Sequence, residues 1–304
     1  MEMAIRTRGL CKQYKSRLAA DHVDMNVQKG DIYGFIGRNG SGKSTTLKML
    51  CGLIRPTGGE IELFGMPVHN EAVRRRTGVL IESAGIYKEC SARENLLLKA
   101  AAMGLVDAEK QADEALRAVG LEAAGKKPAK AFSMGMKQRL GVALALLGGP
   151  DLLLLDEPIN GLDPEGIQEI RRLLVDLNRR RGVTLVVSSH ILGELSRIAT
   201  RYGILKDGRM VREISAEELA AQCMDYLYVR TDDAKKAAVA LEQALGLTRY
   251  EVRPEGELRV YGPADAAAVT GALAARGVGV QAVYPHKQDL ESYFLDLMGG
   301  ERDA

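Results

Sequence analysis

The sequence predicts an α/β protein built on a parallel sheet and followed by a small α+β domain. Two apolar runs of strand length, LLLLDEP and VTLVVSSH, flank a helix-like segment over residues 166–182, which is a βαβ rhythm. After residue 220 the expected order becomes βαββαβ, the split pattern of ferredoxin-like domains. A chain of 304 residues is long enough for about two domains. We therefore place one domain at 1–220 and an accessory domain at 221–304.

Composition limits the classes of function. The chain is 46% apolar and 27% charged, with a formal net charge of +2, so nothing in the charge favours a nucleic-acid partner. No apolar run approaches the ~20 residues that span a bilayer, so work at a membrane would need another chain. The four cysteines show no metal-ligand spacing, which suggests that they are reduced thiols of a cytosolic protein. Three of the histidines also show no local metal-ligand spacing. These cysteines and histidines are Cys11, Cys51, Cys90, Cys223, His22, His69 and His286.

The first elements follow from hydrophobic periodicity. Residues 1–31 alternate polar and apolar in short pieces, which predicts antiparallel strands, and IYGFIG and GKSTTLKMLCGL then predict a buried strand and a helix. The run GVLI at 78–81 predicts a short parallel strand ending on a carboxylate, Glu82. From about residue 92 to 147, apolar residues recur at three- and four-residue spacing, which predicts a helical subdomain.

The later elements include a hairpin and the accessory domain. YGILKDGRMVRE predicts a hairpin with Asp207-Gly208 as its turn. Four tyrosines fall on expected strands of the accessory domain, at positions 226, 228, 250 and 261. A four-stranded sheet carrying aromatics can stack RNA bases, although packing within or against the sheet is the alternative that we favour. The accessory domain contains no catalytic constellation.

One motif carries a specific chemistry. GRNGSGKS fits G-x-x-x-x-G-K-[ST], and it lies between an expected strand and an expected helix, as a phosphate-binding loop requires. Glycines let backbone N–H groups point inward as a nest for phosphate oxygens, and the helix N-terminus adds its dipole. Lys43 would reach the β- and γ-phosphates, and the Ser44 hydroxyl would ligate Mg²⁺.

Polar residues end the two strands that follow. LLLLDEP places Asp156 and Glu157 side by side, and adjacent residues on a strand point to opposite faces, so the two acids can have separate roles. Asp156 suits Mg²⁺ and Glu157 suits polarisation of an attacking water. His190 ends the next strand at the same sheet edge, where it would meet the γ-phosphate.

Together these motifs resemble the nucleotide-binding subunit of an ABC transporter over about residues 3–220. FSMGMKQRL (132–140) is similar to the family signature, NGLDP (160–164) to its D-loop, His190 to its switch histidine and Tyr14 to its adenine-stacking aromatic residue. The resemblance implies a P-loop NTPase fold with a mixed sheet and a helical subdomain. It also implies ATP and Mg²⁺ as cofactors and a dimer that sandwiches two ATP molecules head to tail. The dimer could pair this chain with a different one, but its single, complete motif set favours two identical copies.

The resemblance assigns roles residue by residue. It implies that Ser133 and Gly135 cap the γ-phosphate of the ATP held by the partner subunit. The family usually has Gln where Glu82 stands, so Glu82 is expected to ligate metal and to couple the site to the loop 83–95, where a membrane partner would dock. Expected catalytic residues are Glu157, His190 and Glu82, and expected metal ligands are Ser44, Glu82 and Asp156. Expected nucleotide contacts are Tyr14, Gly37, Arg38, Asn39, Gly40, Ser41, Gly42, Lys43, Ser44, Thr45, Ser133, Gly135 and Asp163.

The resemblance implies an ATPase that energises a separate membrane permease, held at the inner face of the cell membrane by that permease. The stretch LIES-G-Y and the sequence SMGMKQRLG are similar to the bacitracin- and lantibiotic-resistance branch, which favours an exporter of antimicrobial peptides or drugs. The alternative is a soluble clamp on the ribosome or DNA, but such ribosome-acting chains usually carry two phosphate loops and this chain has one. A third possibility makes the accessory domain a regulatory ligand-binding module.

Overall fold

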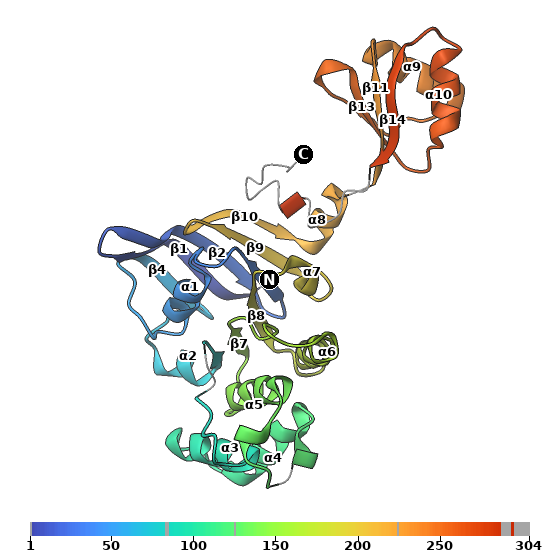
Figure 1. Cartoon of the computed structure of the whole chain (residues 1–304). Helices are drawn as coiled ribbons and strands as arrows, with labels where there is room; N and C mark the ends of the chain where they lie inside the picture. Colours follow the sequence, from blue (N-terminus) through green and yellow to red (C-terminus); the bar gives the residue numbers. More distant parts are fainter. Residues whose placement is uncertain (1, 83–84, 125, 224, 287–292, 295–304) are drawn as a thin grey trace. The chain divides into compact units, whose positions relative to one another are not determined.

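The computed structural model describes residues 2–82, 85–124, 126–223, 225–286 and 293–294. The chain forms two compact units, Met1–Ala216 and Glu217–Ala304, which are coloured blue to yellow and orange to red in Figure 1. The boundary placed after residue 220 on sequence grounds falls inside helix α8 (Ala216–Gln222).

A six-stranded sheet forms the centre of the first unit. Its order is β10 (Arg209–Ser215), β9 (Arg201–Lys206), β3 (Ile32–Ile36), β8 (Thr184–Ser189), β7 (Leu152–Leu155) and β6 (Thr77–Leu80). All neighbouring strands are parallel except the β9–β10 hairpin. Strands β3, β7 and β8 are buried at every residue, because layers cover both faces of a parallel sheet. This confirms the predicted α/β class.

A second sheet of four antiparallel strands packs beside the first. Its order is β2 (Arg17–Gln28), β1 (Met3–Tyr14), β4 (Gly58–Leu63) and β5 (Met66–Pro67). Apolar side chains of β1 and β2 share one core with residues of β3, among them Ile5, Val27 and Phe35. Helix α1 (Lys43–Leu50), which follows β3 and its loop, contributes Leu47 and Leu50 to the same core (Figure 1).

Seven α-helices accompany these sheets in the described part of the first unit. Their bounds are α1 (Lys43–Leu50), α2 (Glu71–Arg75), α3 (Ala92–Ala102), α4 (Ala108–Ala118), α5 (Met134–Leu146), α6 (Pro164–Arg181) and α7 (Leu192–Leu195). Helices α3, α4 and α5, with short 3₁₀ turns at Glu122–Ala124 and Ala129–Ala131, form the helical region expected at 92–147. Ser91 and Glu94 form a capping box at the start of α3, which fixes where that helix begins.

The β9–β10 turn and the edge strand β6 each depend on a glycine. Asp207 and Gly208 have φ values of 48° and 82°, as a two-residue hairpin turn with two left-handed positions requires. At Gly78 in β6, an added Cβ would lie 2.0 Å from the carbonyl oxygen of Ala145 in α5. Glycine is therefore needed where α5 packs on β6, the outermost strand of the sheet.

The second unit has the ferredoxin-like order that its sequence predicts. Its strands pair as β12 (Tyr250–Val252), β13 (Glu257–Tyr261), β11 (Tyr226–Thr231) and β14 (Val280–His286), with every neighbour antiparallel. The helices α9 (Ala234–Leu245) and α10 (Ala266–Ala274) share a core with one face of the sheet, and a 3₁₀ turn covers Pro254–Gly256.

The tyrosines of the second unit pack on its strands. Tyr226 is buried, and Tyr228, Tyr250 and Tyr261 are half-buried. Tyr228 stacks on Tyr284 with ring centroids 4.7 Å apart, and the Arg259 guanidinium lies 4.8 Å from the Tyr226 ring centroid. These contacts are the intramolecular packing that we favoured over an RNA-stacking platform.

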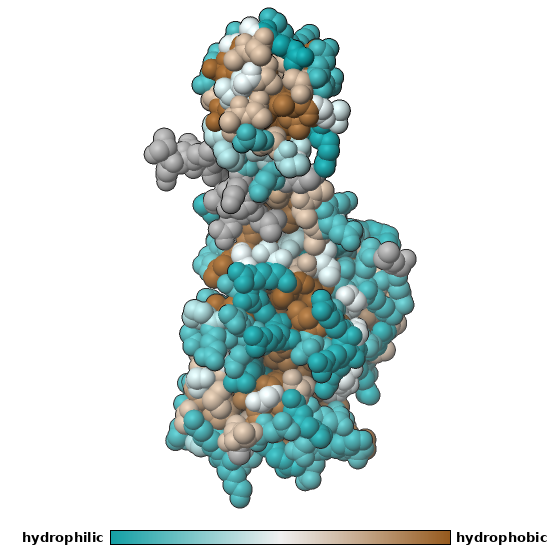
Figure 2. All heavy atoms as spheres, turned by 90° about the vertical axis from the view of Figure 1, so that its right-hand side faces the viewer, coloured by the Kyte–Doolittle hydropathy of each residue, from teal (hydrophilic) through white to brown (hydrophobic). Residues whose placement is uncertain are grey.

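Among the described residues, no helix combines the length and the apolar character needed to cross a bilayer. The surface drawn in Figure 2 is mostly hydrophilic, with hydrophobic residues in small patches.

Candidate nucleotide-binding site

The phosphate-binding motif forms a loop between β3 and α1. Gly40 and Gly42 have φ values of 79° and 107°, a backbone region that side-chain-bearing residues rarely adopt. An added Cβ at Gly42 would lie 2.1 Å from the carbonyl oxygen of Ala19 in β2, and one at Gly37 would lie 2.5 Å from Ser41 Oγ. The loop is therefore shaped by close approach of its backbone to the neighbouring sheet.

Lys43 is the buried cation of this loop. Its side chain is 5% exposed, its ammonium donates a 2.6 Å hydrogen bond to the carbonyl oxygen of Gly37, and it lies 3.3 Å from Glu157 Oε1. A second, 3.3 Å bond goes to the carbonyl oxygen of Arg38. The Lys43 ammonium therefore lies against the loop backbone and is paired with one carboxylate.

A cavity of about 450 Å³ opens over the loop. It is lined by Tyr14, Arg17, Ala19, Asn39, Gly40, Gly42, Lys43, Ser44, Thr45 and Glu157. The Ser41 hydroxyl in the same loop is buried and has no hydrogen-bond partner. A buried hydroxyl without a partner is costly. With the cation and the inward glycine backbone beside it, the loop fits a ligand that brings several acceptor oxygens.

The two acids after β7 have different partners. The buried Asp156 accepts a 2.6 Å hydrogen bond from the Ser188 hydroxyl, and the same hydroxyl accepts the Glu157 N–H at 2.9 Å. The two carboxylates do point in different directions, but strand alternation is not the reason. Strand β7 ends at Leu155, before both acids, and Glu157 adopts a left-handed φ of 48°. This turn directs the Glu157 carboxylate toward Lys43.

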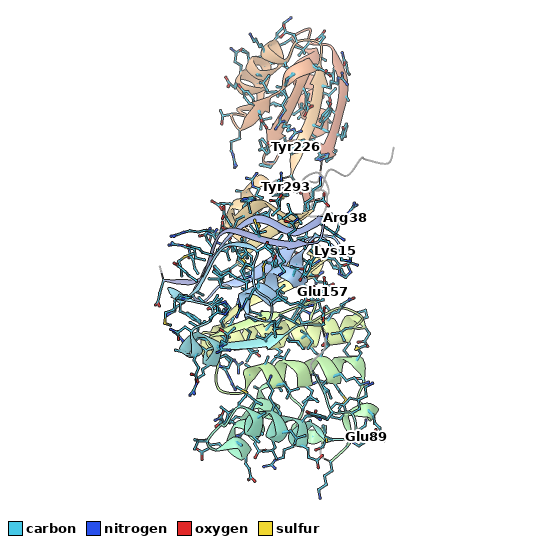
Figure 3. The ribbon with its side chains drawn as sticks, turned by 90° about the vertical axis from the view of Figure 1, so that its left-hand side faces the viewer. Lys15, Arg38, Glu89, Glu157, Tyr226 and Tyr293 are labelled. Atoms are coloured by element: carbon cyan, nitrogen blue, oxygen red, sulfur yellow. The ribbon has the colours of Figure 1, made fainter. Side chains whose placement is uncertain are left out.

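His190 lies where the sequence placed it, beyond the end of β8. Its Nδ1 is 2.9 Å from Glu157 Oε2, while Oε1 of the same carboxylate faces Lys43. Figure 3 labels Glu157 with Arg38 and Lys15, which lie along the same side of the first unit. Glu157 is thus held at both oxygens, and it can polarise a water molecule that enters the cavity.

Tyr14 forms one wall of the cavity at the end of β1. Its side chain is 48% exposed, and the Lys12 ammonium lies 5.2 Å from its ring centroid. Arg17, across the turn in β2, donates a 3.0 Å hydrogen bond to the carbonyl oxygen of Gly40. An exposed ring beside a phosphate loop can stack on a planar base.

Glu82 lies on a second cavity, of about 680 Å³, whose lining also includes Asp156, Glu157 and Met134. Its carboxylate is bonded to the ammonium of Lys48 in α1, and this hydrogen bond raises the pKa of Lys48. The Glu82 side chain is 66% exposed, and its backbone is left-handed, with a φ of 60°. Of the loop 83–95 expected to follow it, residues 83 and 84 lie outside the described part of the chain.

Ser133, Gly135 and Asp163 are placed apart from the phosphate-loop cavity. Ser133 caps α5 by accepting the Met136 N–H at 3.2 Å, and Asp163 caps α6 by accepting the Gly166 N–H at 3.1 Å. An added Cβ at Gly135 would lie 4.0 Å from Leu162 Cδ2, just before Asp163. Within one chain, therefore, the start of α5 lies beside the segment that leads into α6, and it does not line the phosphate loop.

Three residues of the site were not predicted from the sequence. Ser188 bridges the two acids, Arg17 supports the phosphate loop and Lys48 binds Glu82. Ser188 was available as a signal, since it sits in VVSSH two positions before His190. The other two contacts join segments 23 and 34 residues apart, and no local pattern marks them.

Comparisons with known proteins agree with this geometry. Residues 20–160 match the model of the family described as ABC transporter. The bacitracin transport ATP-binding protein BcrA of Bacillus licheniformis is 43% identical over 303 residues, which cover 99% of each chain. The lantibiotic transport ATP-binding protein SrtF of Streptococcus pyogenes is 40% identical over 209 residues, covering 69% of this chain and 90% of SrtF.

A solved structure gives the same fold. The dimeric, post-hydrolysis ATP-binding cassette MJ0796, bound to ADP and Pi, is 27% identical. It superposes with a TM-score of 0.63 over 70% of this chain and 98% of its own.

Proposed function

The chain belongs to the ABC transporter family and is an ATPase, and we propose that it drives the export of a membrane-active peptide such as bacitracin or a lantibiotic through a separate permease. The observation that carries this proposal is the match to a bacitracin transport protein at 43% identity over 99% of both chains. A match that long includes the second unit as well as the nucleotide site. We further propose that the chain is peripheral, held at the inner membrane face by its permease.

The site supports a division of roles within one chain. In the proposal, Lys43 and the loop N–H groups bind the β- and γ-phosphates, and the partnerless Ser41 hydroxyl gains an acceptor. Ser44, Asp156 and Glu82 would hold Mg²⁺, which would supply positive charge against the charge that develops on the phosphates. Glu157 orients the attacking water, His190 holds Glu157 and reaches the γ-phosphate, and Tyr14 stacks on adenine.

A homodimer completes the site in this proposal. Ser133 and Gly135 do not line the phosphate-loop cavity of their own chain. The α5 N-terminus, with its partial positive charge, is well suited to cap a γ-phosphate held by a second copy. Asp163, at the start of α6, would lie at the same interface.

The dimer proposal is tested by trapping. With Mg-ATP, Glu157→Gln should bind nucleotide without turning it over and should elute from gel filtration as a stable dimer. Glu165→Gln, an exposed acid in the first turn of α6, is the matched control and should remain an active ATPase. A Glu157→Gln protein that stays monomeric at saturating Mg-ATP would contradict the sandwich arrangement.

The transport proposal is tested in cells. A strain lacking the chain should become more sensitive to bacitracin or to a lantibiotic, and the wild-type chain but not Glu157→Gln should restore resistance. Tagged chain purified from membrane and soluble fractions should co-purify with a polytopic membrane protein. Recovery with ribosomes or DNA and not with membranes would favour the clamp alternative and would leave the ATPase assignment intact.

A further inference from the structure

A β-bulge distorts the β1–β2 ladder next to the nucleotide site. Leu10 pairs with Val23 and Lys12 pairs with Ala20, so Cys11 of β1 faces two residues of β2, Asp21 and His22. His22 takes up the irregularity with a left-handed φ of 52°, a conformation that is rare outside glycine.

The bulge brings three potential metal ligands together. On a regular strand, Asp21 and His22 would point to opposite faces. Here the Cys11 thiol, the Asp21 carboxylate and the His22 imidazole each place one ligand atom within 4.8 Å of the others. The backbone N–H of His22 donates a hydrogen bond to Cys11 Sγ at 3.3 Å, and the imidazole Nδ1 of His22 lies 2.7 Å from Asp21 Oδ1. Non-glycine backbone strain that serves to converge reactive side chains is typical of functional positions.

The cluster would offer a cation one net negative charge, because the Arg209 guanidinium balances the Asp21 carboxylate and a Cys11 thiolate would add a second negative charge. Asp21 is buried, and Arg209 of the β9–β10 hairpin holds its second oxygen, Oδ2, at 2.6 Å. The other oxygen of this carboxylate, Oδ1, is therefore held in position to ligate a metal ion. The His22 side chain is 78% exposed and Cys11 is half-buried, so the cluster is open on one side to solvent and to an incoming ion.

We propose that Cys11, Asp21 and His22 form a binding site for a thiophilic divalent cation, with Zn²⁺ as the ion that these donors suit best. Sulfur, nitrogen and carboxylate oxygen are the three ligand types of zinc sites, and a water would complete a tetrahedron on the exposed side. The ion would take the place of the proton between His22 Nδ1 and Asp21 Oδ1, that proton would move to the imidazole Nε2, and the Cys11 thiol would release its own proton to solvent. Tetrahedral ligation needs an N···O separation of about 3.3 Å, so the imidazole moves by a few tenths of an ångström.

The location gives the site a consequence for the nucleotide loop. The Asp21 N–H donates to the carbonyl oxygen of Gly208 at 2.8 Å, and the Gly208 N–H donates to the carbonyl oxygen of Ser41 at 2.9 Å. Cys11 lies three residues before Tyr14 on the same strand. A bound ion would fasten β1 to β2 beside the Gly208 contact that reaches the phosphate loop at Ser41. This inference does not depend on what the transporter carries.

Cobalt substitution tests the site, because Co²⁺ bound to a thiolate gives a charge-transfer absorption that oxygen and nitrogen ligands do not. The full-length chain, freed of its tag and treated with chelator, should bind one equivalent of Co²⁺ with this band, and one equivalent of Zn²⁺ should displace it. Cys11→Ser should abolish the band. His22→Gln should weaken binding at least about tenfold, since even outer-sphere substitutions at metal sites cost that much.

Two controls keep the outcome decisive. Cys51→Ser, at another half-buried cysteine of the first unit, should leave the titration unchanged. His22 and Cys11 do not line the nucleotide cavity, so ATP binding retained by both variants in the metal-free form shows that each is folded. The proposal is overturned if the wild-type chain shows no thiolate band at one equivalent of Co²⁺, if Cys11→Ser keeps the band, or if Cys51→Ser removes it.

Discussion

Ser188→Ala removes the hydroxyl that joins the two acids of the nucleotide site. That hydroxyl is fully buried, donates to the Asp156 carboxylate at 2.6 Å and accepts the Glu157 N–H at 2.9 Å. A hydrogen bond to a charged group contributes about 1.5–3 kcal/mol and a neutral one about 0.5–1.5 kcal/mol. We expect the substitution to lower the free energy of unfolding of the first unit by about 2–4 kcal/mol.

Thermal unfolding measures this loss directly. For a domain of this size 1 kcal/mol corresponds to about 2–4 °C, so the midpoint should fall by about 4–16 °C. ATP hydrolysis should fall as well, measured below the new midpoint, because Asp156 and the Glu157 backbone lose their common anchor. Ser196→Ala is the control, since its hydroxyl makes one 3.1 Å bond to the carbonyl oxygen of Gly193 and should cost about 1 kcal/mol or less. A Ser188→Ala protein with the wild-type midpoint and rate would refute the bridging role.

Two further predictions concern ionised groups. Glu82→Gln should change the free energy of unfolding by less than about 1 kcal/mol, because its ion pair with Lys48 is exposed. The same variant should lower ATP hydrolysis and transport, and unaltered rates of both would contradict the coupling role proposed for Glu82. Hydrogen bonds from the Ser91 backbone and hydroxyl lower the pKa of Glu94, so its contribution to stability is present above the unfolded pKa of about 4.3 and is lost as pH falls through the lower folded value. Glu94→Gln should therefore flatten the acid limb of the stability curve measured by urea unfolding, and a limb as steep as wild type would show that this carboxylate contributes nothing.

Structural elements that depend on a few adjacent residues were predictable from the sequence. The run LLLL predicted a buried strand, and Asp207-Gly208 predicted a hairpin turn, because each depends on a few adjacent residues. The glycine positions of the phosphate loop were predictable for the same reason, since each answers a backbone requirement that no other residue meets.

Contacts between distant segments were beyond that reasoning. The pairing of Glu82 with Lys48 depends on where β6 ends relative to α1, and side-chain spacing within either segment does not encode it. The bulge opposite Cys11 needs a left-handed histidine, and His22 carries no sequence mark of that conformation. The local spacing of the cysteines and histidines accordingly gave no metal-ligand pattern, whereas the hairpin brings Cys11 and His22 together from eleven positions apart.

The hydrophobic clusters described for the two units draw on different parts of the chain, and this has a consequence for how such chains are inherited. The buried cluster of the second unit draws on residues between 227 and 283, and that of the nucleotide-binding unit on residues between 4 and 210. The aligned length of SrtF, 209 residues covering 90% of that relative, is close to that of the first unit alone. A recombination event near residue 216 therefore splits neither hydrophobic cluster. Gain, loss or exchange of the ferredoxin-like unit at this point of the chain would leave the described hydrophobic cluster of the ATP-hydrolysing unit intact.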